Sequence, residues 1–184
     1  WAFEFYKKQQ QMHWLPEEVP LQDDIKDYKE KLSEGERSLI DNIFKFFTQA
    51  DVDVCCGYAK HYLPTFKQPE VRMMLVSYAA MEAVHQEAYS LLLETLGKSD
   101  DMYQEFFDIN YPRHNLMKGM GQIVTWSVRD ESLHVEGLSK LFRTFIAENP
   151  EIWTDKLKYE IYCAAERVVE LEDSFIDVCF DNAD

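Results

Sequence analysis

The sequence predicts an all-α protein, a bundle of helices, and three observations support this fold class. Apolar residues recur at the three- and four-residue spacing of an α-helix over several long stretches. Proline, glycine and capping residues stand where such helices would begin and end, and no stretch has the alternating pattern of a strand. With 184 residues, 46% of them hydrophobic, the chain is long enough for one domain with its own core.

The first element is a short helix, expected over residues 1–12. Trp14 follows it, and Pro16 stops helical structure because proline disfavours the helical conformation of the residue before it. The acidic, polar stretch from there to Leu32 is expected to be a loop with about one helical turn. Residues 1–32 therefore form an N-terminal segment ahead of the main bundle.

A capping box at Ser33 opens the first long helix, which is expected to run to about Tyr62. Asp51 follows Phe47 by four residues and so continues the apolar stripe of this helix, which is made by Leu39, Ile43, Phe47 and Ala50. A carboxylate in line with a core stripe is costly unless it is paired or bound to a metal. Asp51 is thus a candidate metal ligand, and the alternative is a partly exposed acid between helices.

The second long helix is expected to begin at Pro69 and to end at Gly97. It carries Glu82 and His85 inside an apolar pattern at helical spacing, made by Met74, Tyr78, Met81, Ala88 and Leu92. Tyr89 lies one turn beyond His85 on the same face. Taken alone, Tyr89 is an ordinary core tyrosine.

Two further long helices are expected over about 115–147 and about 150–180. The first of them carries Glu131 and His134 on a face shared with apolar residues. Asn149 and the proline after it provide an N-cap and a first helical residue for the last helix.

Two Glu-x-x-His pairs, Glu82 with His85 and Glu131 with His134, stand out in this pattern. Each places a carboxylate and an imidazole on one face of its helix. A single pair is commonly solvated surface, whereas bundled helices with two pairs are typical of di-iron and di-manganese carboxylate proteins. The sequence therefore predicts a dinuclear metal site with Asp51 as a further ligand.

A complete site of this kind needs four ligand helices, and the count falls one short. About 17 residues separate Gly97 from Asn115, too few for a bundle-length helix with its turns. We expect that a helical segment with the fourth carboxylate is missing between residues 110 and 111. The alternative is that the last helix supplies Glu166 or Glu170.

Composition excludes several classes of function. The 34 acidic and 19 basic residues give a formal net charge of -15, which argues against a nucleic-acid binder. The four cysteines have no zinc-type spacing, which favours a reduced, cytoplasmic chain. No apolar run reaches the length of a membrane span and no signal peptide is evident, so we expect no membrane partner.

Four stretches carry a resemblance to a known family: FFTQADVDV, MEAVHQEAYS, MKGMGQIVTWSVRDESLHVEG and HWLPEEV. On these motifs the chain resembles the small, radical-generating subunit of class I ribonucleotide reductase, a member of the ferritin-like superfamily. The resemblance covers nearly the whole sequence and implies one ferritin-like helical domain over residues 1–184. The family's metal ligands fall on Asp51, Glu82, His85, Glu131 and His134.

The resemblance also implies a mechanism. A pair of iron ions, or a manganese or mixed manganese–iron pair, would activate oxygen and generate a radical on Tyr89. The oxidising equivalent would pass through His85, Asp130 and Trp14 to a cysteine of the large catalytic subunit, which reduces ribonucleotides to deoxyribonucleotides. The small subunit would be a homodimer. The family's third ligand helix and its C-terminal tail are missing from this sequence.

Three other functions stay open from the sequence. A di-iron oxidase or oxygenase of the same fold would act on a small organic substrate, but Tyr89 and the Trp14 and Asp130 pair favour the reductase. A ferritin-like iron-storage protein would form a large shell, in which the N-terminal segment has no role. A helical dimer that has lost its metal is the non-enzymatic alternative.

Overall fold

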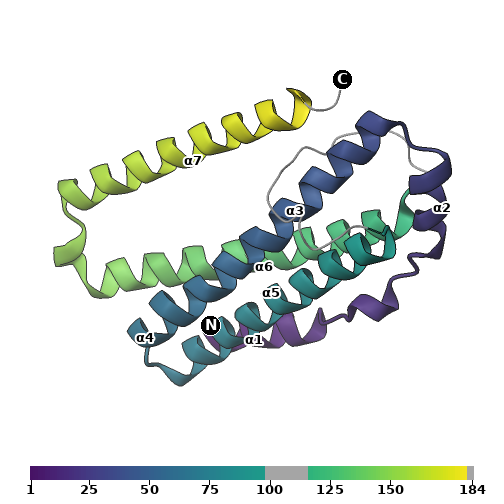
Figure 1. Cartoon of the computed structure of the whole chain (residues 1–184). Helices are drawn as coiled ribbons and strands as arrows, with labels where there is room; N and C mark the ends of the chain where they lie inside the picture. Colours follow the sequence, from purple (N-terminus) through teal and green to yellow (C-terminus); the bar gives the residue numbers. More distant parts are fainter. Residues whose placement is uncertain (98–115, 182–184) are drawn as a thin grey trace.

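The computed structural model describes residues 1–97 and 116–181, and within these ranges its regular elements are all helices (Figure 1). The predicted all-α bundle is confirmed. In chain order the elements are α1 (Ala2–Gln11), η1 (Pro16–Glu18), α2 (Gln22–Glu30), α3 (Glu34–Gly57), η2 (Tyr58–Tyr62), α4 (Leu63–Thr65), α5 (Pro69–Thr95), α6 (Lys118–Glu148), η4 (Pro150–Ile152) and α7 (Asp155–Asp181).

Helices α3 and α5 pack along each other, and α1 and α6 both contact α5. The buried apolar residues form two clusters, one around Phe44 and Leu92 and the other around Met74 and Tyr78. The α5 residues of these clusters follow one another along the helix, so α5 is the central element of the bundle. Helix α7 lies to one side, where it contacts α3. No helix among the described residues is both long and apolar enough to cross a membrane.

The capping box at the start of α3 forms as predicted. The Glu36 backbone N–H donates to Ser33 Oγ at 3.2 Å, and the Ser33 backbone N–H donates to Glu36 Oε2 at 2.8 Å. The α-helical pattern ends at Gly57, and the predicted continuation to Tyr62 is a π-helical turn, η2. A π-helical turn of this kind marks a local change in the hydrogen-bond ladder.

Helix α5 begins at Pro69 and is followed by Gly97, as predicted. The φ of Gly97 is 83°, the left-handed conformation that glycine adopts without a steric cost just after a helix. Helix α6 begins at Lys118, and the predicted start at Asn115 lies outside the described residues.

The predicted loop before Leu32 is wrong, because this stretch contains η1 and the nine-residue helix α2. Asp24 of α2 is buried, and its carboxylate accepts hydrogen bonds from the backbone N–H groups of Gly119 and Met120, at 2.9 and 2.8 Å. These N–H groups have no partner within their own helix, and the positive end of α6 also favours a negative charge there. The polar sequence of this stretch predicts exposed acids. Asp24 is nevertheless buried, because it bonds to the start of α6, a helix far along the chain.

The predicted start of the last helix is also wrong. Asn149 precedes only the short 3₁₀ turn η4, and its side-chain amide donates back to the Phe145 carbonyl at 2.9 Å. Helix α7 begins at Asp155, where Thr154 Oγ1 accepts from the Leu157 backbone N–H at 3.2 Å. Thr154 is therefore the N-cap, and its capping bond accounts for the later start.

The close approach of α5 and α6 yields a test of this packing. The hydroxyl of Tyr78 donates to the Leu133 carbonyl at 3.2 Å, and a Cβ added at Gly137 would overlap that hydroxyl. We expect Gly137→Ala to lower the free energy of unfolding by about 1–3 kcal/mol, measured by denaturant titration.

Gly121 provides the matched control, since it lies on the same helix with nothing within 4 Å of an added Cβ. Gly121→Ala should raise stability by about 0.5–1 kcal/mol, because alanine is the better helix former. Equal stabilities of the two variants would contradict the packing at Gly137.

Candidate metal centre

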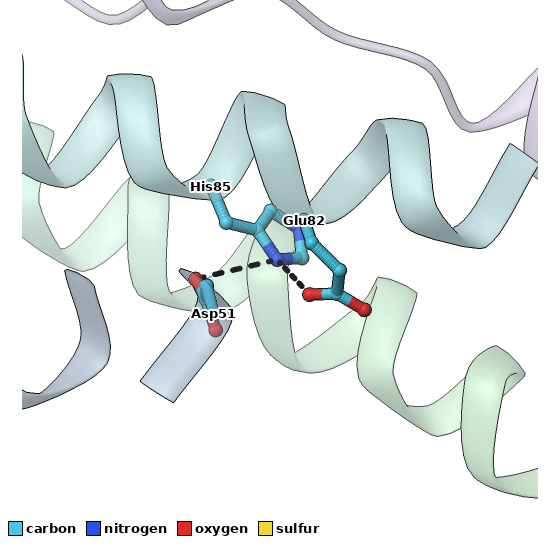
Figure 2. Close-up of side chains that lie close together, drawn as sticks. All are labelled: Asp51, Glu82 and His85. Atoms are coloured by element: carbon cyan, nitrogen blue, oxygen red, sulfur yellow. Dashed lines mark ion pairs between the residues drawn. The ribbon is translucent and has the colours of Figure 1, made fainter. Parts of the chain in front are cut away.

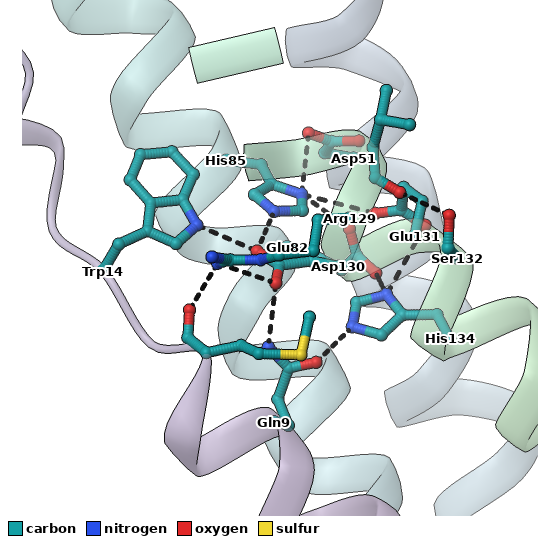
Figure 3. Close-up of polar contacts among 12 residues, drawn as sticks. Gln9, Trp14, Asp51, Glu82, His85, Arg129, Asp130, Glu131, Ser132 and His134 are labelled. Atoms are coloured by element: carbon teal, nitrogen blue, oxygen red, sulfur yellow. Dashed lines mark hydrogen bonds and ion pairs between the residues drawn. The ribbon is translucent and has the colours of Figure 1, made fainter. Parts of the chain in front are cut away.

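Three helices bring all five predicted ligands together, as Figures 2 and 3 show: Asp51 from α3, Glu82 and His85 from α5, Glu131 and His134 from α6. They fall into two groups that share Glu82. In each group the candidate ligand atoms lie within 4.8 Å of one another. Two neighbouring groups with a common carboxylate are the arrangement expected for two adjacent cations.

Glu82 and Glu131 each span both imidazoles. Glu82 Oε2 lies 3.5 Å from His85 Nδ1, and Glu82 Oε1 lies 3.1 Å from His134 Nδ1. Glu131 Oε1 lies 3.3 Å from His85 Nδ1, and Glu131 Oε2 lies 3.4 Å from His134 Nδ1. Asp51 Oδ2 is more distant, at 4.0 Å from His85 Nδ1 (Figure 2). Both glutamates therefore lie close to both imidazoles, and Glu82 is the carboxylate that belongs to both groups.

The inward-facing atoms of this cluster are buried and lack hydrogen bonds. Both Glu82 oxygens, Asp51 Oδ2, Glu131 Oε1 and His134 Nδ1 have no hydrogen-bond partner among the described residues. Leaving buried charged or polar atoms without partners costs free energy, and bound cations would remove this cost. Because the donors are carboxylate oxygens and imidazole nitrogens, the residues fit a pair of iron or manganese ions.

The pKa shifts show how strongly these groups interact. Burial raises the pKa of Asp51 to about 8, and the negative charges of Glu82 and Glu131 add to the effect. Burial opposes the charged form of His85, but its contacts with Asp130, Glu131 and Glu82 outweigh this and raise its pKa to about 11. Without a cation, protons on the imidazoles and on Asp51 therefore balance part of the negative charge.

The outward nitrogens of both imidazoles contact side chains behind the cluster (Figure 3). His85 Nε2 lies 3.2 Å from Asp130 Oδ2, and His134 Nε2 lies 3.0 Å from Gln9 Oε1. Since both partner atoms are acceptors, each Nε2 carries a proton and donates it. In the neutral ring this leaves the Nδ1 lone pair facing the cluster, which is the tautomer that a metal requires.

Asp130 connects the cluster to Trp14. Trp14 Nε1 donates to Asp130 Oδ2 at 2.8 Å, and the Trp14 ring stacks on the His85 ring with centroids 5.9 Å apart. Burial alone would raise the pKa of Asp130, but the hydrogen bonds from His85 and Trp14 lower it below its usual value. The two predicted relay residues thus contact each other and His85 directly.

Tyr89 lies beside the cluster without belonging to either ligand group. Its ring centroid is 6.4 Å from that of His85, and it packs against Phe44 and Phe47 with centroids 5.5 and 5.2 Å away. Burial raises the pKa of the Tyr89 hydroxyl well above its usual range, and the negative charge of Asp51 adds to the shift. The phenol therefore stays protonated in a dry aromatic pocket.

The sequence interpretation missed Gln9. Its side chain is buried, and besides its contact with His134 its Nε2 donates to Asp130 Oδ1 at 3.4 Å. The signal available was weak, because Gln9 is the first of three consecutive glutamines in a polar stretch. Only its spacing from Ala2 and Phe5, the other buried residues of α1, indicates an inward face.

The centre is open on the side of Glu131, whose side chain is 46% exposed although its Oε1 is buried. Helix α7 does not fill this side, because Glu166 and Glu170 are both exposed and Glu170 pairs with Arg167 at 2.8 Å. The alternative in which the last helix supplies the fourth carboxylate is therefore not supported. No further carboxylate joins the two groups among the described residues.

Comparisons with a family model and with individual proteins identify the same family. The family model described as "Ribonucleotide reductase, small chain" matches residues 1–111 and 109–184. The probable ribonucleoside-diphosphate reductase small subunit 376L of Invertebrate iridescent virus 6 is 36% identical over 243 residues, which cover 96% of this chain and 68% of the viral protein.

Two solved structures share the fold. The dimanganese(II)-NrdF of Streptococcus sanguinis superposes with a TM-score of 0.85 at 19% identity, covering 98% of this chain and 79% of that one. A mutant R2-like ligand-binding oxidase with an anaerobically reconstituted Mn/Fe cofactor has a TM-score of 0.75 at 17% identity, covering 98% of this chain and 86% of that one.

The geometry predicts that the purified protein binds divalent iron or manganese with proton release. Because the pKa of His85 is raised to about 11 and a ligand imidazole must lose its proton, affinity should rise with pH between about 6 and 8. Calorimetry in buffers of different ionisation enthalpy measures the released protons. An affinity independent of pH would contradict this charge arrangement.

His85→Ala and Glu131→Ala should each weaken binding by at least about tenfold, since each removes a donor from the cluster. Glu136→Ala is the matched control, because this exposed glutamate lies on α6 outside both groups. Full metal occupancy in both cluster variants would contradict the ligand assignment.

Proposed function

The chain belongs to the ribonucleotide reductase small-chain family, and from this premise we propose that it is the radical-generating small subunit of a ribonucleoside-diphosphate reductase. The observation that carries the proposal is an unbroken set of contacts. It leads from the carboxylate and histidine cluster through His85 and Asp130 to Trp14, with Tyr89 beside His85.

The five clustered residues would hold two metal ions. Two features support this: buried atoms that face the cluster have no hydrogen-bond partner, and the candidate ligand atoms are carboxylate oxygens and imidazole nitrogens. Iron, manganese or a mixed pair fits these donors equally well. When bound, such a pair supplies the one-electron oxidising chemistry, with oxygen as the oxidant. Asp130 and Gln9 would keep both imidazoles oriented, because they hold the outward Nε2–H groups.

Tyr89 would store the oxidising equivalent. Its hydroxyl would give up one electron to the oxidised centre and one proton to a carboxylate of the ligand cluster, and would be left as a neutral phenoxyl radical. Phe44 and Phe47 cover the ring and exclude water and small reductants, which would lengthen the lifetime of the radical. Because burial raises the pKa of the Tyr89 hydroxyl, its proton does not leave before the electron.

Trp14 and Asp130 would carry the oxidising equivalent out of the centre. One electron would pass from Trp14 by way of His85 to the Tyr89 radical, which takes up a proton and becomes tyrosine again. The charged Asp130 carboxylate would stabilise the positive charge left on the indole. The final electron donor would be the large catalytic subunit, which reduces the ribonucleotide. We further propose that the chain works as a homodimer in the cytoplasm.

An oxidase acting on a small molecule is the second candidate, favoured by the likeness to the R2-like ligand-binding oxidase. That likeness concerns the fold alone. The viral reductase subunit is the more similar in sequence, and an oxidase with a substrate at its metals needs no buried relay tryptophan bonded to Asp130. The reductase is therefore the better supported function.

We also propose that a segment with the fourth carboxylate ligand is missing between residues 110 and 111. Two findings support this position. The family model matches in two stretches that meet at residues 109–111, and the alignment with the viral relative is longer than this chain, so part of it faces a gap. The partial exposure of the Glu131 side chain is compatible with this proposal.

Radical formation and radical export are predicted to be separable. Tyr89→Phe removes only the phenolic oxygen, so metal content and fold should persist while the tyrosyl signal in electron paramagnetic resonance disappears. Turnover with the large subunit should fall by at least about 100-fold. Trp14→Phe should keep the tyrosyl signal but lose turnover to a similar extent.

Tyr162→Phe is the control, because Tyr162 is 72% exposed on α7. It should match the wild type in signal and turnover. Normal turnover of Tyr89→Phe would make Tyr89 a core tyrosine and would leave the oxidising equivalent on the metals or on another residue.

The missing segment has a direct test in the protein from its natural source. We expect an intact mass clearly above the 21.8 kDa of these 184 residues, and peptide sequencing across Asn110 should reveal additional residues. A peptide in which Asn110 is joined directly to Tyr111 would refute the proposal.

A further inference from the structure

A second tryptophan, Trp126, contacts Trp14. Trp126 lies on α6 one turn before Asp130, and its ring centroid is 5.1 Å from that of Trp14 with an interplanar angle of 57°. Among the described residues, the Trp14 ring contacts the rings of His85 and Trp126. Three rings therefore follow one another outward from the metal centre.

The two indoles differ in burial. Trp14 is 2% exposed and belongs to the buried core, whereas Trp126 is partly buried and packs against the edge of that core. A donor in solution or on a partner protein cannot touch the Trp14 ring. The Trp126 ring contacts the Trp14 ring and is also partly exposed to solvent. It can therefore carry an electron between a donor at the surface and Trp14.

We propose that Trp126 is a second relay tryptophan, which passes one electron from a donor at the surface of α6 to oxidised Trp14. The inference rests on the proposed function, since that function is what oxidises Trp14. The step moves one electron and no proton between the rings: Trp14 returns to the neutral indole with its Nε1–H still bonded to Asp130. Trp126 is left as an indole radical cation, which the surface donor then reduces.

The alternative is a purely structural role, in which the large Trp126 ring only covers the edge of the core and transfers no electron. Substitution separates the two roles. Phenylalanine keeps an aromatic ring that is too hard to oxidise, whereas tyrosine keeps one that can be oxidised where water can accept its proton. Trp126→Phe and Trp126→Tyr thus remove the same indole but differ in redox capacity.

The first experiment uses the metal-free full chain and a bulky photo-generated one-electron oxidant that cannot reach the buried ring. Oxidation of Trp14 is quantified by peptide mass spectrometry. We expect Trp126→Phe to lower Trp14 oxidation by about tenfold and Trp126→Tyr to restore most of it. Trp153→Phe should change nothing, because this exposed indole packs against Phe142 away from the relay. Equal oxidation of Trp14 in the wild type and Trp126→Phe would overturn the proposal.

The second experiment uses the metal-loaded protein and identifies the donor. If a small reductant enters through Trp126, Trp126→Phe lowers the yield of the tyrosyl signal when ascorbate is supplied during loading. If the donor is the large subunit, the signal is normal and turnover falls. Wild-type values for Trp126→Phe in both measurements would overturn the relay role.

Failure of the proposed function gives a different result from failure of this inference. A wild-type protein with neither tyrosyl signal nor turnover would contradict the radical-generating function. The metal-free measurement would still decide whether one electron can pass between the Trp126 and Trp14 rings. Circular dichroism and metal content of each variant exclude misfolding as the cause of a loss.

Discussion

The buried contact between two glutamates and two imidazoles is the interaction on which the rest of the structure depends. Glu82 and Glu131 each face both His85 and His134, in a core where unpaired charge is costly. When no cation is present, protons on the imidazoles and on Asp51 offset part of the negative charge of the carboxylates. Bound cations would replace these protons. The close packing of α5 and α6 makes this contact possible. It depends on Gly137, which leaves room for the Tyr78 side chain between the two helices.

The N-terminal segment is part of the centre and not an appendage to it. Gln9 and Trp14 bond to His134 and Asp130 behind the cluster, so residues before the bundle orient ligands that lie far along the chain. Asp24 of α2 caps the start of α6. Loss of these contacts would loosen the helix that carries Asp130, Glu131 and His134, with consequences for metal affinity as well as stability.

The centre combines a closed side with an open one. On the closed side, Tyr89 lies in an aromatic pocket and the line from His85 through Trp14 to Trp126 runs from the cluster to the surface. On the open side, Glu131 is partly exposed. This asymmetry agrees with the proposed function, in which the centre would hold an oxidising equivalent away from solvent and release it along one route.

Local pattern was enough to predict the long helices and the five candidate ligands, but not α2 or the start of α7. The two Glu-x-x-His pairs and Asp51 lie in line with apolar stripes, and periodicity within one helix decides which face a residue occupies. The ends marked by Ser33, Pro69 and Gly97 are likewise set by bonds within a few residues. Only the tertiary structure decided the partners of Gln9, Asp24 and Trp126. Gln9 meets Asp130 across 121 positions, and Asp24 meets Gly119 across 95; such partners depend on how whole helices pack, which no local pattern contains.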